Sequence, residues 1–172
     1  MPIDTIRMEW GGVLAVGDEK DAHRAVQGEG GYALVVYAGK ELRPPPQALA
    51  DRGSSRKVRI FHIPLEDARR PLSDAERFSL MQGLMLIKDV FKRQRKPVLV
   101  TSKDGINRAP FVVALALADL YGCGGSEAMR AVKNYKVRDK RALENPVFTH
   151  HLLTVPRRMN GVLRLDNGMS VL

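Results

Sequence analysis

The sequence predicts an α/β fold with a central mixed, mostly parallel sheet flanked by helices on both sides. Short apolar runs rich in β-branched residues, at 32–38 and 97–101, are typical of strands buried on both faces. Longer segments with helical character separate these runs, and strands that alternate with helices favour a parallel sheet. The chain has 172 residues, of which 44% are hydrophobic, so we expect one domain with a substantial core.

The first half of the chain is expected to contain three strands, one helix and one long loop. The strand segments are residues 11–16, 32–38 and 58–65, the last of which alternates polar and apolar side chains up to Pro64. Residues 18–27 begin with acidic side chains, which the positive end of a helix dipole favours. Residues 43–57 contain three prolines and a Gly-Ser-Ser sequence, which predicts a loop.

A long helix is predicted over residues 71–96. Ser73 and Glu76 have the spacing of a capping box, in which each side chain binds the backbone N–H of the other residue. One apolar face follows at helical spacing, formed by Leu80, Leu84, Ile87 and Phe91. The segment ends in Lys-Arg-Gln-Arg-Lys, whose positive charge complements the negative end of the helix dipole.

The second half is expected to continue the alternation and to end in an extension. A buried strand at 97–101 precedes a mostly apolar helix at 108–122, and two further helices are predicted at 126–136 and 145–155. We assign residues 1–158 to one domain. Residues 159–172 form a C-terminal extension in which Asn-Gly separates two apolar runs, and this pattern predicts a β-hairpin.

The overall charge restricts the classes of partner. The formal net charge is +9 and the sequence pI is about 10.0, which favours anionic partners such as phosphorylated groups, nucleic acid or an acidic surface. A single cysteine allows no disulfide within the chain, and the four histidines show no metal-ligand spacing. No signal peptide and no membrane span of roughly 18 apolar residues is recognisable, so we expect a cytoplasmic protein.

The loop between the strand at 97–101 and the helix at 108–122 is the main candidate for a functional site. In such a loop backbone N–H groups converge beside a helix N-terminus, which favours a phosphate- or sulfate-type anion. Its sequence differs from the nucleotide-binding pattern G-x-x-x-x-G-K-S/T and from the serine-hydrolase pattern G-x-S-x-G. The candidate anion-binding residues are Lys103, Asp104, Gly105, Ile106, Asn107 and Arg108.

This stretch resembles the active-site loop of the cysteine-dependent protein tyrosine and dual-specificity phosphatases, which reads H-C-x-x-G-x-x-R-S/T. The present sequence reads T-S-K-D-G-I-N-R-A, so Gly105 and Arg108 match. The resemblance extends over roughly residues 9–155. It includes Asp67, 35 residues before position 102, and the "NPVF" segment of the family's last helix. It implies a compact dual-specificity-type fold that hydrolyses phosphate monoesters through a phosphocysteine, with Asp67 as general acid and with neither metal nor cofactor.

Three positions depart from the family pattern. Ser102 stands at the place of the nucleophilic cysteine, Thr101 at that of the histidine and Ala109 at that of the hydroxyl residue. A serine hydroxyl without an adjacent base is a poor nucleophile, so we expect the chain to bind phosphate without turning it over. Two explanations remain open at this stage, namely an engineered cysteine-to-serine change in an active phosphatase and a natural pseudophosphatase.

The substrate class also stays open. The resemblance to compact dual-specificity enzymes implies a phosphorylated protein or another phosphate monoester. The "GINR" sequence is similar to the loop of RNA 5′-triphosphatases in the same superfamily, so an RNA 5′ end is an alternative, although aromatic residues make up only 6% of the chain. A phosphoinositide is a third option. Glu66 is a second candidate for the general acid, and Arg69 and Arg70 are candidates for binding a further anionic group.

Overall fold

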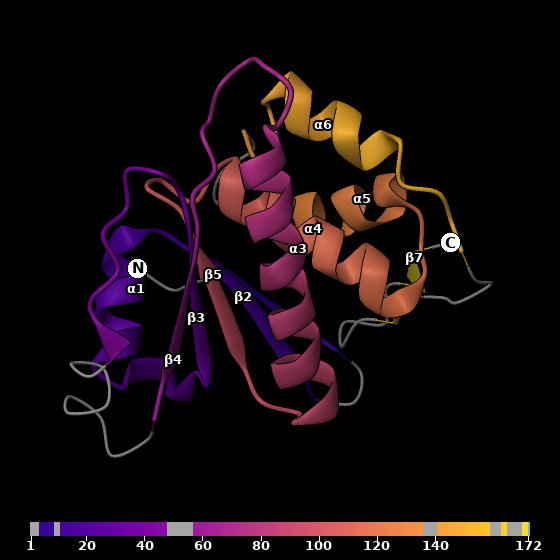
Figure 1. Ribbon diagram of the computed structural model, residues 1–172. Helices are drawn as coiled ribbons and strands as arrows, with labels where there is room; N and C mark the ends of the chain where they lie inside the picture. Colours follow the sequence, from indigo (N-terminus) through magenta and orange to yellow (C-terminus); the bar gives the residue numbers. More distant parts are fainter. Residues whose placement is uncertain are drawn as a thin grey trace.

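The computed structural model describes residues 4–8, 11–47, 57–135, 141–158, 163–164 and 170–171. Their centre is a five-stranded sheet with the strand order β1-β2-β5-β3-β4 (Figure 1). The strands are β1 (Asp4–Arg7), β2 (Val13–Gly17), β3 (Leu34–Ala38), β4 (Arg59–Ile63) and β5 (Val98–Thr101). Strand β1 is antiparallel to β2, and the other neighbours are parallel. The predicted mixed, mostly parallel sheet is thereby confirmed.

Helices cover both faces of this sheet, as predicted. Helix α1 (Glu19–Val26) lies on one face, against β2, β3 and β5. The other face carries α3 (Asp74–Lys88), α4 (Arg108–Tyr121), α5 (Gly125–Tyr135) and α6 (Pro146–Leu153), as Figure 1 shows. Short elements among the described residues include a 3₁₀ turn at Glu29–Gly31, a π-helical turn at Asp89–Arg93 and the two-stranded sheet of β6 (Leu163–Arg164) and β7 (Ser170–Val171).

The two central strands and helix α4 form the middle of the core. Strands β3 and β5 are buried at every position, in agreement with their continuous apolar sequences. Helix α4 lies behind them and is buried along nearly its whole length. Phe111 of this helix stacks on Phe148 of α6 with 4.5 Å between the ring centres. Helix α6 is thereby attached to the element that begins at the candidate loop.

Several predicted boundaries were wrong. The helix predicted at 71–96 begins only after Ser73, because the reciprocal hydrogen bonds of Ser73 and Glu76 fix its first turn. It changes to the π-helical turn after Lys88, and Arg95 then has a positive φ of 53°. Strand β4 stops at Ile63 because Pro64 offers no N–H for the sheet ladder. Strand β1 was not predicted, since its four residues, Asp-Thr-Ile-Arg, have little apolar character.

Parts of three further predictions lie outside the described residues. Positions 48–56 belong to the expected loop at 43–57, position 136 to the helix expected at 126–136, and positions 161–162, 165–169 and 172 to the expected C-terminal hairpin. The described ends of that hairpin, β6 and β7, pair antiparallel with Leu163 opposite Val171. Within the described part of the chain, none of the helices combines the length and apolarity that a membrane crossing requires.

Candidate active site

The candidate loop lies at the carboxyl edge of the parallel strands, where β5 ends and α4 begins. Neighbouring strands hold its first residues. The Thr101 hydroxyl donates to the carbonyl of Val36 in β3 at 3.2 Å, and the N–H of Ser102 donates to the carbonyl of Gly17 in β2 at 3.3 Å. Thr101 and Ser102 are both completely buried. The loop is therefore anchored from both sides, at the sheet edge where ligands of open α/β sheets usually bind.

Hydrogen bonds within the loop define its shape. The Ser102 hydroxyl accepts from the N–H of Gly105 at 3.1 Å, and the Asp104 carboxylate accepts from the N–H of Ile106 at 2.9 Å. Gly105 has a φ of +69°, and a β-carbon there would come within 3.0 Å of the Gly17 carbonyl oxygen. Lys103 and Asp104 are exposed. The loop thus turns tightly around the Ser102 oxygen, while its outer side chains face solvent.

Arg108 opens helix α4 and is only 5% exposed. Its Nη1 donates to a carboxylate oxygen of Glu41 at 2.6 Å and to the carbonyl of Leu65 at 3.4 Å. Its Nε is buried and has no hydrogen-bond partner among the described residues. The hydrogen bond from Arg108 lowers the pKa of Glu41 below its ordinary value, although partial burial opposes this shift. Glu41 was not among the predicted site residues, and no local sequence pattern marks it.

The structure brings Asp67 to the loop. One carboxylate oxygen of Asp67 accepts from the Asn107 side-chain amide at 3.1 Å, and the other accepts from the Asn145 amide at 2.6 Å. Asn107 is the loop residue just before Arg108, whereas Asn145 caps α6 through a bond to the N–H of Val147. The sequence analysis predicted Asp67 and Asn107 as site residues, but it did not predict Asn145. Its position before Pro146, at the start of an expected helix, was the available signal.

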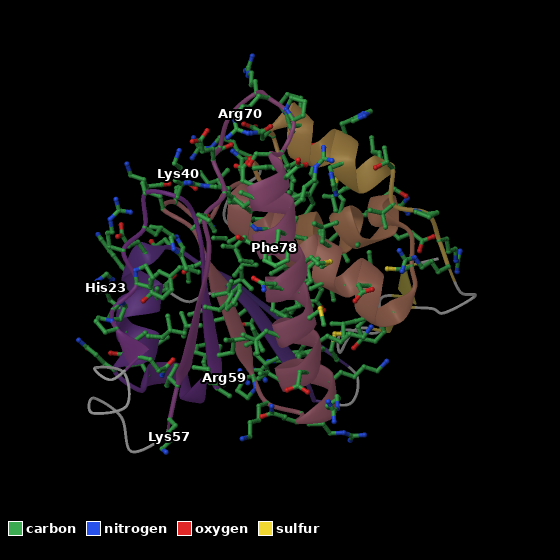
Figure 2. All side chains as sticks on the ribbon, viewed as in Figure 1. His23, Lys40, Lys57, Arg59, Arg70 and Phe78 are labelled. Carbon is green, nitrogen blue, oxygen red and sulfur yellow. The ribbon has the colours of Figure 1, made fainter. Side chains whose placement is uncertain are left out.

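Two of the other three candidates near Asp67, Glu66 and Arg70, lie in a separate group of ion pairs. Glu66 pairs with Lys40 at 2.5 Å and with Arg70 at 2.6 Å, and Arg70 also contacts Glu76 at 2.8 Å. Lys40 and Arg70 both project from the edge of the molecule above α1 and α3 (Figure 2). The hydrogen bonds from Lys40 and Arg70 lower the pKa of Glu66. Glu66 and Arg70 are therefore bound to each other and to the start of α3, while Arg69 is exposed.

The chain is similar to known proteins in its backbone structure. No protein-family model matches the chain, and no curated protein sequence matches it either. Human DUSP28 aligns with a TM-score of 0.65 and 22% identity over 88% of this chain and 92% of that chain. PTP-2 phosphatase of Cydia pomonella aligns with a TM-score of 0.64 and 16% identity, covering 94% of this chain and 96% of that chain.

A viral structure agrees with these two. OH1 from the Orf virus, described as a tyrosine phosphatase with triple substrate specificity, aligns with a TM-score of 0.53 and 24% identity. The alignment covers 81% of this chain and 80% of that chain. Because all these identities are below one quarter, the likeness concerns the arrangement of the backbone. The chain therefore has the fold of the tyrosine and dual-specificity phosphatases.

Proposed function

We propose that this chain is a phosphoprotein phosphatase of the tyrosine or dual-specificity type in a form that binds phosphate monoesters without turning them over. The observation that carries the proposal is the buried Arg108, whose Nε lacks a partner among the described residues. A buried guanidinium donor without a partner is unfavourable, and a phosphate oxygen held in the loop would satisfy it. The fork geometry of arginine suits two oxygens of the same phosphate.

The start of helix α4 supports the same interpretation. Asn107 occupies the N-cap position, but its side chain makes no capping bond to α4, because it is engaged with Asp67 and with the backbone at 144–145. The first N–H groups of α4 are thus not covered by a capping side chain. Together with the positive end of the helix dipole, they favour an anion at this position.

Ser102 explains why turnover is not expected. The hydrogen bond at its oxygen comes from the N–H of Gly105, which is a donor and cannot remove the hydroxyl proton. Positive potential in such a loop converts a thiol to a thiolate, but it does not produce an alkoxide at neutral pH. In a cysteine form, the same N–H would stabilise the thiolate.

With cysteine at position 102 the arrangement would support hydrolysis in two steps. The thiolate attacks phosphorus, the bond to the leaving oxygen breaks, and Asp67 gives its proton to that oxygen while Arg108 binds the equatorial oxygens. In the second step Asp67 takes a proton from water. The resulting hydroxide attacks phosphorus, so a phosphorus–oxygen bond forms as the phosphorus–sulfur bond breaks, which releases inorganic phosphate and restores the thiolate. Ala109 supplies no hydroxyl to assist this departure of sulfur, so we expect the second step to be slow.

The first experiment places cysteine at the nucleophile position. We expect Ser102→Cys to hydrolyse 4-nitrophenyl phosphate between about pH 5 and pH 8, and the Ser102 protein to be inactive. Asp67→Ala in the cysteine form is expected to remove the basic limb of the pH profile. Calorimetry should show that the Ser102 protein binds tungstate, a phosphate mimic, and that Arg108→Lys weakens this binding by about tenfold or more.

The possible outcomes separate the alternatives. A Ser102→Cys protein that binds tungstate but stays inactive would contradict the phosphatase proposal and favour a natural phosphate-binding module. Failure of all forms to bind tungstate would exclude an anion site in the loop. The substrate class is tested with a phosphotyrosine peptide, a phosphothreonine peptide and an RNA carrying a 5′-triphosphate. Preferential and salt-sensitive turnover of the RNA would favour the RNA 5′-phosphatase alternative, for which the exposed Lys103 of the loop offers a positive charge.

A further inference from the structure

We propose that Asn107 and Asn145 act together as positioning residues for Asp67; this inference rests on the proposed function. The two amides bind opposite oxygens of the Asp67 carboxylate, at 3.1 and 2.6 Å. Asp67 itself is exposed, so few packing contacts restrict its side chain. Two hydrogen bonds from different elements therefore determine the orientation of this carboxylate relative to the candidate loop.

The orientation of both amides is fixed by their other hydrogen bonds. The side-chain oxygen of Asn107 accepts from the N–H groups of Glu144 and Asn145, at 2.9 and 3.1 Å. The side-chain oxygen of Asn145 accepts from the N–H of Val147 at 2.9 Å. Each amide must therefore present its NH₂ group to Asp67. A carboxylate held in this way still has a lone pair on each oxygen for the proton that it transfers.

The same contacts join three segments that are distant in the sequence. Asp67 lies between β4 and α3, Asn107 lies in the candidate loop, and Asn145 is the N-cap residue of α6. A backbone bond from Leu143 to the carbonyl of Ile106, at 3.0 Å, strengthens the junction between the last two. Because a small displacement of an acid group strongly reduces its efficiency, these contacts should matter for catalysis beyond their effect on stability.

The kinetic test uses the Ser102→Cys protein and two substrates that differ in the leaving group. Asn145→Ser keeps a capping oxygen for α6 but cannot reach Asp67. We expect this variant to lower kcat by about tenfold with phenyl phosphate, whose departing phenolate needs a proton, and by less than about threefold with 2,4-dinitrophenyl phosphate. Asn107→Ala is expected to give the same difference between the two substrates. A merely structural role would lower both rates by the same factor, and that result would overturn the proposal.

A double-mutant cycle provides the control. In an Asp67→Asn background no acid remains to be positioned, so Asn145→Ser should cause no further selective loss with phenyl phosphate. An equally selective loss in that background would contradict the proposal. Thermal unfolding of each variant reports whether the fold is intact. If the parent Ser102→Cys protein is inactive, the proposed function fails. The contacts of Asn107 and Asn145 with Asp67 are then tested by a second measurement, which uses the Ser102 protein and requires no activity.

That second measurement is nuclear magnetic resonance of the side-chain amides. Asp67→Ala should shift the NH₂ signals of both Asn107 and Asn145, because each loses the same acceptor. Asn107→Ala should also shift the NH₂ signal of Asn145. This shift should be smaller when Asn107→Ala is made in the Asp67→Ala protein. Unchanged NH₂ signals in Asp67→Ala would show that these contacts do not form in solution and would overturn the inference, whatever the activity.

An independent observation concerns the outer face of α3. The large hydrophobic side chains that are exposed among the described residues are Phe78, Met81, Met85 and Leu153, with exposed fractions of 57%, 52%, 67% and 57%. Three of them follow one line along α3, and Figure 2 shows Phe78 on this outer side. Charged residues lie at the two ends of the same line. We name this line the α3 seam, and it consists of Asp74, Phe78, Met81, Met85 and Lys88.

We infer that the α3 seam binds the α3 seam of a second copy of this chain. Its residues are spaced four, three, four and three apart, which is the spacing of a helix–helix contact. A two-fold axis beside Met81 sets Phe78 opposite Met85 of the second copy and Asp74 opposite Lys88. The charges at the ends are thus complementary only in the antiparallel arrangement. Lys88 is 47% exposed at its side chain and pairs with Asp119 of the same chain at 3.3 Å, so in the dimer Asp74 of the second copy would share it with Asp119.

The surface beside the seam can receive a side chain of the second copy. A groove of about 420 Å³ lies next to Met81 and Met85. Its wall is mostly apolar, and it also includes the charged side chains of Arg77 and Asp119; the remaining lining residues are Leu80, Leu84, Leu115 and His151. Phe78 of the second copy has a suitable apolar shape for it. The contact area of one helix face is modest, so we expect a weak dimer whose population depends on concentration.

Sedimentation velocity over a range of concentrations tests the dimer. We expect Phe78→Glu and Met85→Glu to weaken association by about tenfold or more, because each places a charge in the apolar contact. Leu153→Glu, an equally exposed position on α6 outside the seam, should leave association unchanged. Asp74→Lys and Lys88→Asp should each weaken it, and the double variant should restore it. A protein that stays monomeric at all concentrations, or that is affected equally by Leu153→Glu, would overturn the inference.

Discussion

At the scale of single residues, the candidate site depends on a glycine that no other residue can replace without strain. Gly105 combines a φ of +69° with a close approach to the Gly17 carbonyl, and its N–H is the group that contacts the Ser102 oxygen. The backbone of the loop can therefore close around position 102 only because there is no β-carbon at 105.

A matched pair of glycine variants separates the effect of the positive φ from the effect of the close approach to the Gly17 carbonyl. Gly11 has a φ of +87° but open space where a β-carbon would lie. We expect Gly11→Ala and Gly105→Ala each to lower the free energy of unfolding by about 1–2 kcal/mol, because of the positive φ. Gly105→Ala should also weaken tungstate binding by about tenfold, since the loop must shift. Chemical denaturation and calorimetry check both values. Equal tungstate affinities in the two variants would contradict our account of the loop.

At the scale of elements, the start of α3 combines a capping box with an ion pair to Arg70 in the segment just before the helix. The Glu76 carboxylate accepts from the N–H groups of Ser73 and Glu66, at 2.8 and 3.0 Å, and from Arg70 at 2.8 Å. Burial alone would raise the pKa of Glu76, but the hydrogen bonds from Arg70 and from the backbone outweigh it and lower the pKa to about 2. The segment that carries Asp67 is thereby attached to the helix that follows it.

This arrangement predicts a specific acid sensitivity. The ordinary pKa of Glu76 is 4.5, so its stabilising contribution is complete above that pH and is lost as the pH falls from about 4.5 towards about 2. We expect Glu76→Gln to lower stability by about 1–2 kcal/mol at pH 7 and to lose less stability on acidification than the parent protein. Thermal unfolding at several pH values measures this. Ser73→Ala, which keeps the carboxylate, should retain the acid sensitivity; the same acid response in Glu76→Gln and the parent would exclude Glu76 as its origin.

At the scale of the whole molecule, the last two described strands pair with each other and are not part of the five-stranded sheet. Strand β7 contacts helix α5. The candidate site is built from β2, β3, β5, the segment after β4, and the ends of α4 and α6. The predicted division at residue 158 would leave all predicted site residues in the larger part.

Deletion of residues 159–172 tests this division. Because the buried apolar residues of the described part of the chain and all the site residues lie before position 159, we expect the shortened chain to unfold cooperatively and to bind tungstate with an affinity within about twofold of the full chain. Circular dichroism during thermal unfolding and calorimetry provide the two measurements. A chain that no longer folds after the deletion would show that the extension belongs to the domain.

The sequence by itself determined the fold class, the order of most elements and the position of the loop. Apolar runs and capping signals are local, so β3, β5, α4 and the start of α3 could be recognised within short windows, and Gly105 and Arg108 could be recognised from their spacing. Only the tertiary structure decided which groups meet there. Glu41 and Arg108 are 67 residues apart, Asp67 and Asn107 are 40 apart, and Asp67 and Asn145 are 78 apart. Such contacts leave no local signature, because chain topology brings their partners together only when the parallel strands end at one edge of the sheet.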